Sequence, residues 1–153
     1  MPYLFLTLLL VLLDQLVKRW VTLHIPLGGS VPFLPHVLEL AHVRNSGAAF
    51  SILEDHTWFL TLCSLVMSVV LLLALWKGFF HHPAGKVTLA VILAGAVGNL
   101  IDRFLNGYVV DMFHVLLFRF AVFNVADMCV VGGGAAALVY YLFFYERLEA
   151  PMV

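Results

Sequence analysis

Two aspartates, Asp111 and Asp127, stand in sequence surroundings suited to acid/base chemistry. Asp127 is the third residue after Asn124, directly before an apolar run, which is the spacing of a helix N-cap with its capping-box acid. One interpretation is purely structural; the other is that the positive end of the helix dipole favours the ionised carboxylate. Asp111 follows an apolar Tyr-Val-Val, where desolvation favours the protonated form. Two carboxyl groups, one favoured in its protonated form and the other in its ionised form, can serve as a general acid and a general base.

Two further polar pairs are spaced four residues apart, so each pair lies on one face of a helix. Asp14 and Lys18 have the favourable acid-first order of a helical ion pair. They either support the site or make a charged helix tolerable in lipid, with Lys18 reaching towards headgroups. Asn99 and Arg103 form the second pair, and Arg103 either contacts lipid phosphates or orients a carboxylate.

The sequence contains no pattern typical of other catalytic chemistries. There is no HExxH zinc motif, no GxSxG elbow and no glycine-rich nucleotide loop. The adjacent His81 and His82 have no carboxylate nearby in the sequence, so we interpret them as solvated rather than as metal ligands. We therefore expect no metal and no cofactor. The net charge of −1 argues against nucleic acid as a partner.

The elements that must position these residues are membrane helices. Of 153 residues, 63% are hydrophobic and 11% are charged, whereas soluble domains have roughly 25% charged residues. This composition excludes a soluble globular domain. We expect an all-α membrane protein of one domain, 1–153, with four transmembrane helices. Their predicted ranges are about 2–23, 57–76, 87–105 and 128–145.

The connections between these helices differ in length and character. Two long ones, 24–56 and 103–127, contain β-branched and alternating stretches, which predict a small extramembrane or interfacial β element. Small residues are expected to allow close helix packing at Ala90, Ala94 and Gly98 and at Gly132–Gly134.

With four spans, both long connections emerge on one face of the membrane. The polar residues that sit oddly in or near apolar segments fall towards this face: Asp14, Lys18, Asn45, Asn99, Asp102, Arg103, Asp111, Asn124 and Asp127. Intramembrane polar groups that gather at one depth indicate a functional site. The distribution of Lys and Arg leaves the orientation open, because several of these cations belong to the candidate site.

Five motifs occur in order along the chain. They are DQLVK (14–18), RNSGAAFS (44–51), GNLIDR (98–103), VVD (109–111) and FNVAD (123–127). Together they closely resemble the motifs of the bacterial lipoprotein signal peptidases, or signal peptidase II family. Two positions depart from the family's pattern, Met112 and Met128.

The resemblance implies an aspartyl endopeptidase of the bacterial cytoplasmic membrane, which cuts prolipoproteins before a diacylglyceryl-modified cysteine. Its catalytic dyad falls on Asp111 and Asp127. Its substrate-binding or supporting residues fall on Asp14, Lys18, Asn45, Asn99, Arg103 and Asn124. The resemblance also implies a site towards the periplasmic or outer side, with both termini cytoplasmic.

The implied partners are the diacylglyceryl-prolipoprotein substrate and the lipid bilayer. We expect a monomer, because a site built between the chain's own helices needs no second copy. An alternative function is a small proton-coupled transporter that uses its intramembrane carboxylates as a relay. The clustering of the acids at one end of the helices favours the peptidase.

Overall fold

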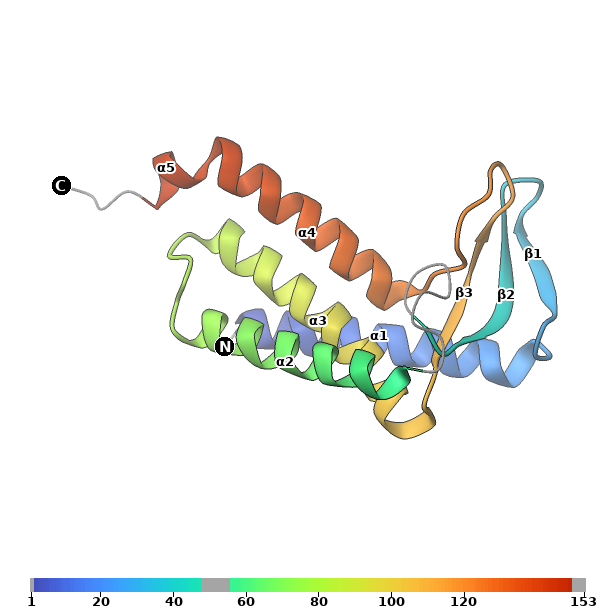
Figure 1. Ribbon diagram of the computed structural model, residues 1–153. Coiled ribbons are helices and arrows are strands. Elements are labelled where there is room, and N and C mark those ends of the chain that lie inside the picture. The colour runs from blue at the N-terminus through green and yellow to red at the C-terminus, as the bar shows by residue number, and fades with distance from the viewer. Residues whose placement is uncertain (1, 48–55, 150–153) are drawn as a thin grey trace.

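The computed structural model describes residues 2–47 and 56–149, and it is mostly helical with one small sheet (Figure 1). The helices are α1 (Pro2–His24), α2 (Thr57–Trp76), α3 (Pro83–Asn106), α4 (Val125–Phe143) and the short α5 (Tyr145–Leu148). The strands are β1 (Ser30–Leu34), β2 (Leu38–Asn45) and β3 (Val109–Val115). The second half of the RNSGAAFS motif, 48–51, lies outside the described residues.

Within the described residues, three helices are long and apolar enough to cross a membrane: α2, α3 and α4. The 23-residue α1 is long enough, but it carries Asp14, Lys18 and Arg19. Three of the four predicted spans therefore meet the criteria of length and composition, and the membrane-spanning role of α1 stays a prediction.

Helix α3 is the centre of the bundle, because it packs against α1, α2 and α4. It begins four residues before the predicted start, since Pro83 occupies its first turn and His82 caps it by accepting a hydrogen bond from the Ala84 N–H. It ends at Asn106 and is capped by Gly107, whose φ of 76° is the left-handed conformation that a glycine adopts readily. This end of α3 lies beside the sheet, so Asn99 and Arg103 are positioned near the strands.

The predicted β element is confirmed as a three-stranded antiparallel sheet in the order β1-β2-β3. The sheet lies across one end of the helices, whereas the start of α1 and the short α5 lie at the other end (Figure 1). The register of β2 against β3 shifts between Leu40 and Val43, and the two consecutive residues inside this irregularity, Ala41 and His42, are both buried. The residues after Val115 form a turn and loop, and only a single bridge, Phe113 to Phe123, continues the pairing.

The glycines that were predicted to allow close helix packing do not all do so. A Cβ built on Gly98 would lie 2.7 Å from Asp14 Oδ2, and one on Gly133 would lie 2.8 Å from Ile92. These two glycines allow close helix packing, as predicted. The prediction is wrong for Gly132 and Gly134, where an added Cβ would meet nothing within 4 Å.

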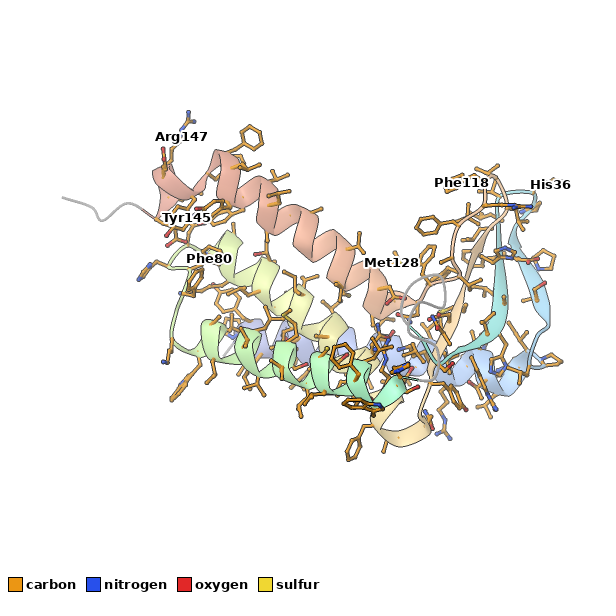
Figure 2. All side chains as sticks on the ribbon, in the orientation of Figure 1. His36, Phe80, Phe118, Met128, Tyr145 and Arg147 are labelled. Atoms are coloured by element: carbon orange, nitrogen blue, oxygen red, sulfur yellow. The ribbon has the colours of Figure 1, made fainter. Side chains whose placement is uncertain are left out.

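The end of the bundle opposite the sheet is held by Glu149. Its carboxylate accepts hydrogen bonds from Tyr140 Oη at 2.7 Å and from the backbone N–H groups of His81 at 2.7 Å and His82 at 3.0 Å. Burial opposes its ionisation, but these donors outweigh it and lower the pKa of Glu149 to about 2. His81 thus has a carboxylate partner that was invisible in the local sequence. Aromatic side chains, including Phe80 and Tyr145, fill the same end (Figure 2).

Candidate active site

The first turn of α4 holds Asp127 by a complete capping box. Asn124 Oδ1 accepts the Asp127 N–H at 2.8 Å, and the Asn124 N–H donates to Asp127 Oδ2 at 3.1 Å. The predicted N-cap is therefore confirmed, and α4 begins three residues earlier than expected because the capping box belongs to it. The other carboxylate oxygen, Oδ1, accepts a hydrogen bond from Asn99 Nδ2 at 2.8 Å. Both oxygens of Asp127 are thus acceptors, as suits an ionised carboxylate.

Asp111 lies on β3, and its side chain is directed at the start of α4. It is 2% exposed and accepts hydrogen bonds from Asn124 Nδ2 at 2.6 Å and from Asn45 Nδ2 at 2.9 Å. Desolvation raises the pKa of Asp111 to about 6; the charge on Asp127 adds to this rise, and the two amide donors oppose it. The expectation that burial favours protonated Asp111 is therefore met by the structure.

The two aspartates are connected through amides whose orientation is fixed. The capping hydrogen bond turns Asn124 Oδ1 towards α4, so its Nδ2 must face Asp111. Asn99 Oδ1 accepts from both Lys18 Nζ at 3.1 Å and Asn124 Nδ2 at 3.2 Å. Its Nδ2 is therefore left to donate to Asp127. Lys18 and the helix cap together determine the orientation of the Asn99 and Asn124 amides.

Lys18 is buried between two carboxylates from different helices. Its Nζ lies 2.8 Å from Asp14 Oδ2 and 2.9 Å from Asp102 Oδ2, and its side chain is only 4% exposed. The Ala126 N–H donates to Asp14 Oδ1 at 2.8 Å, and the Val110 N–H donates to Asp102 Oδ2 at 3.2 Å. The predicted ion pair of Lys18 with Asp14 is thus present. Asp14 fixes the residue before Asp127, and Asp102 fixes the residue before Asp111.

Two polar residues of this cluster were missing from the predicted site. Asp102 was noted for its position but was not assigned to the site, and Gln15 was overlooked. Gln15 Nε2 donates to Asp102 Oδ1 at 3.0 Å, to Asp14 Oδ2 at 3.2 Å and to the Gly98 carbonyl at 3.2 Å. The available signal was the polar Asp-Gln pair inside an otherwise apolar helix.

Arg103 lines the site, and its hydrogen bonds to described residues are few and long. Its guanidinium makes two long hydrogen bonds, both at 3.4 Å, to Ser64 Oγ and the Gly47 carbonyl. Its Nε is buried and has no hydrogen-bond partner among the described residues. Arg103 therefore has donors left for a group that enters the site.

A cleft of about 640 Å³ opens over these residues. Its polar lining is Asn45, Asn99, Arg103, Asp111 and Asp127. The rest of its lining is apolar and comes from Val109, from 120–123 and from α4 between Met128 and Gly132. Met128 marks the end of α4 nearest the sheet (Figure 2). All the predicted site residues thus lie in the cleft or directly support those that do.

This geometry provides a general base and a general acid in a half-enclosed, largely apolar space. When ionised, Asp127 can accept a proton, and Asp111, whose pKa burial raises to about 6, can donate one when protonated. Such a pair can activate a water molecule for hydrolysis.

Comparisons with known proteins show the family to which the chain belongs. Residues 6–144 match the family model described as signal peptidase (SPase) II. The lipoprotein signal peptidase of Streptococcus agalactiae is 43% identical over 121 residues, which cover 79% of each chain. That of Lactiplantibacillus plantarum is 40% identical over 133 residues, covering 86% of this chain and 87% of the relative.

Solved structures show the same fold. A bacterial membrane enzyme determined by the in meso method at 2.3 Å resolution superposes with a TM-score of 0.88 at 26% identity, covering 99% of this chain and 93% of the other. A second one, determined at 1.9 Å resolution, gives a TM-score of 0.85 at 28% identity, with 94% of both chains covered. The chain belongs to the signal peptidase II family of membrane aspartic peptidases.

Proposed function

We propose that this chain removes the signal peptide from diacylglyceryl-modified prolipoproteins, with Asp111 and Asp127 as its catalytic dyad. The observation that carries the proposal is the pair itself: two carboxylates from β3 and α4, joined by Asn124 and exposed to one cleft. The relatives named lipoprotein signal peptidase support prolipoprotein as the substrate.

In the proposed mechanism, ionised Asp127 takes a proton from a water molecule as that water attacks the scissile carbonyl. Protonated Asp111 donates a hydrogen bond to the carbonyl oxygen and then passes its proton to the leaving amine as the carbon–nitrogen bond breaks. The proton that Asp127 took from water moves to Asp111, which returns the dyad to its starting state. The support for this division of roles is the burial of Asp111, which raises its pKa to about 6, and the two donors on Asp127. The reaction needs only side chains and water.

The supporting residues have separate roles in this proposal. Asn45 and Asn124 position Asp111, and Asn99 positions Asp127. Lys18 and Asp14 hold Asn99 and the start of α4. Arg103 lines the cleft and binds a polar group of the substrate next to the scissile bond through its guanidinium, whose two hydrogen bonds to described residues are both long, at 3.4 Å.

The proposed membrane arrangement follows from the helices. We propose that α1 crosses the bilayer beside α2, α3 and α4, because Asp14 and Lys18 face protein and each other rather than lipid. The chain is then a single membrane domain, active as a monomer in the cytoplasmic membrane. Both termini lie on the cytoplasmic side, and the sheet with the cleft lies on the outer side.

The test is cleavage of a diacylated prolipoprotein by the purified protein in detergent micelles. Asp111→Asn and Asp127→Asn should each reduce kcat by at least about a thousandfold while leaving the thermal unfolding transition in place. Arg19→Gln, a change at an exposed residue, serves as the control. Activity near that of the control in either Asp variant would show that the dyad is assigned wrongly.

A further inference from the structure

Two carboxylates outside the dyad each hold the backbone beside one of its members. Asp14 Oδ1 accepts a hydrogen bond at 2.8 Å from the N–H of Ala126, the residue before the dyad aspartate of α4. Asp102 Oδ2 accepts one at 3.2 Å from the N–H of Val110, the residue before the dyad aspartate of β3. A change in the distance between Asp14 and Asp102 is therefore passed through the backbone to the dyad.

Gln15 connects these two carboxylates. Its Nε2 donates to Asp102 Oδ1 at 3.0 Å, to Asp14 Oδ2 at 3.2 Å and to the Gly98 carbonyl at 3.2 Å. All three partners are acceptors, so the amide nitrogen, and not the amide oxygen, must face them. Lys18 makes a second connection, from Asp14 Oδ2 to Asp102 Oδ2. Gln15 thus holds the other oxygen of Asp102, and the orientation of this carboxylate is fixed at both oxygens.

A neutral donor suits this position in the cluster. Asp14 and Asp102 are buried, at 1% and 3% exposed, and Lys18 lies between them. When both carboxylates are ionised, a single cation leaves one negative charge uncompensated, and the carboxylates repel each other. The Gln15 amide stabilises both of them without adding charge. Its removal should let the two carboxylates, and the backbone groups that they hold, move apart.

We propose that Gln15 is a positioning residue that sets the separation of the two dyad aspartates. It acts through Asp14 and Asp102, whose carboxylates hold the two backbone segments, rather than by contact with the substrate. This inference rests on the proposed function and extends it. The position of a catalytic group affects the chemical step, so changes at Gln15 should act on kcat rather than on KM.

The pH profile gives a readout of this separation. Burial and the charge of Asp127 raise the pKa of Asp111 to about 6, whereas its two amide donors and the charge of Lys18 oppose the rise. The remaining charged group that lines the cleft in the described structure is Arg103. If the aspartates move apart, the charge of Asp127 acts on Asp111 from farther away, so this pKa falls. The basic limb of the kcat/KM profile then moves to lower pH, whereas a loss of stability alone leaves it in place.

The experiment compares Gln15→Met with Thr7→Val in the cleavage of a diacylated prolipoprotein by the purified protein. Methionine keeps the length of the glutamine side chain and removes its donor. Thr7 Oγ1 donates to the Ala90 carbonyl at 3.0 Å, so Thr7→Val removes a hydrogen bond between α1 and α3 away from the site and is the matched control. Gln15→Met should lower kcat at least about tenfold, keep KM within about twofold and move the basic limb to lower pH. Thr7→Val should keep the kcat and the basic limb of the parent protein.

The other outcomes overturn the proposal. An unchanged kcat in Gln15→Met, an equal fall in Thr7→Val, or a fall in kcat with the basic limb in place refutes the spacing role. A rise in KM alone refutes it as well, because Gln15 then contributes to substrate binding. Gln15→Asn keeps the amide on a shorter side chain and guards against misfolding of the methionine variant; its kcat should also fall, and a parent-like value refutes the role. If the parent protein itself cleaves no diacylated prolipoprotein, the proposed function fails, and the role of Gln15 fails with it.

Discussion

Replacing Lys18 with methionine should both destabilise the protein and slow cleavage. Methionine keeps the length of the side chain but removes the only cation that contacts the carboxylates of Asp14 and Asp102 in the described structure. Breaking a buried ion pair by removing one partner typically costs about 3–5 kcal/mol, because the remaining charge is buried without compensation. We expect a loss of this size in the free energy of unfolding, since two carboxylates are left facing each other's charge.

The same substitution should disturb the catalytic geometry. Asn99 Oδ1 loses the Lys18 donor and keeps only the 3.2 Å hydrogen bond from Asn124, so the amide that donates to Asp127 is held less firmly. A displacement of about 1 Å in a catalytic group can reduce the rate about a hundredfold, and we expect kcat to fall by this order.

The assay is reversible unfolding in detergent micelles together with cleavage kinetics on the folded fraction. Arg19→Met is the matched control, because Arg19 is the neighbouring cation and is exposed. A double variant, Lys18→Met with Asp102→Asn, removes one of the stranded charges and should show a coupling energy of about 1–3 kcal/mol. If Lys18→Met loses less than about 1 kcal/mol, or if the two changes are additive, the ion cluster does not hold the site as described.

Four further predictions concern other residues of the molecule. The basic limb of the pH profile of kcat/KM should have its midpoint near the Asp111 pKa of about 6. The Asn45 amide stabilises the charged form of Asp111, so Asn45→Val should raise this pKa and move the midpoint to higher pH. A shift to lower pH would contradict this. Since the folded state binds this proton more tightly than the unfolded chain, the free energy of unfolding should rise as the pH falls from about 6 towards 4. Gly98→Ala should lower the free energy of unfolding by about 1–3 kcal/mol, because the added methyl group clashes with Asp14. Gly134→Ala should leave the free energy of unfolding unchanged or raise it. Equal losses in the two variants would refute the packing argument. Glu149→Gln should lower the thermal midpoint by removing a charged acceptor, with kcat unchanged because the cluster lies at the end away from the sheet; a fall in kcat would show coupling between the two ends.

Local patterns in the sequence predicted the local parts of the site. The capping box of Asn124 and Asp127 and the pairing of Asp14 with Lys18 depend on residues three or four positions apart, whose geometry a helix fixes by itself. The strands were predicted by alternation and β-branched residues for the same reason. The start of α3 was placed too late because Pro83 was assigned to the loop, although proline is favoured in the first turn of a helix.

Contacts between elements were not predictable in this way. The bridge from Lys18 to Asp102 and the three hydrogen bonds of Gln15 depend on how α1 packs against α3, which no single segment encodes. The three consecutive glycines of α4 likewise look equivalent in the sequence. Only the position of each one on the helix surface separates Gly133, which packs against α3, from Gly132, which lines the cleft.

The position of the capping box in the chain determines when, during synthesis, the candidate site is complete. Asp127 and Asn124 start the last long helix, while their partners Lys18, Asn99 and Asp111 lie earlier in the chain. During synthesis, a chain that has emerged only as far as β3 has every supporting residue but one and lacks Asp127, the proposed general base. If that proposal holds, the nascent chain cannot cleave a substrate before α4 has been synthesised, and a truncated product that ends before this helix is inactive.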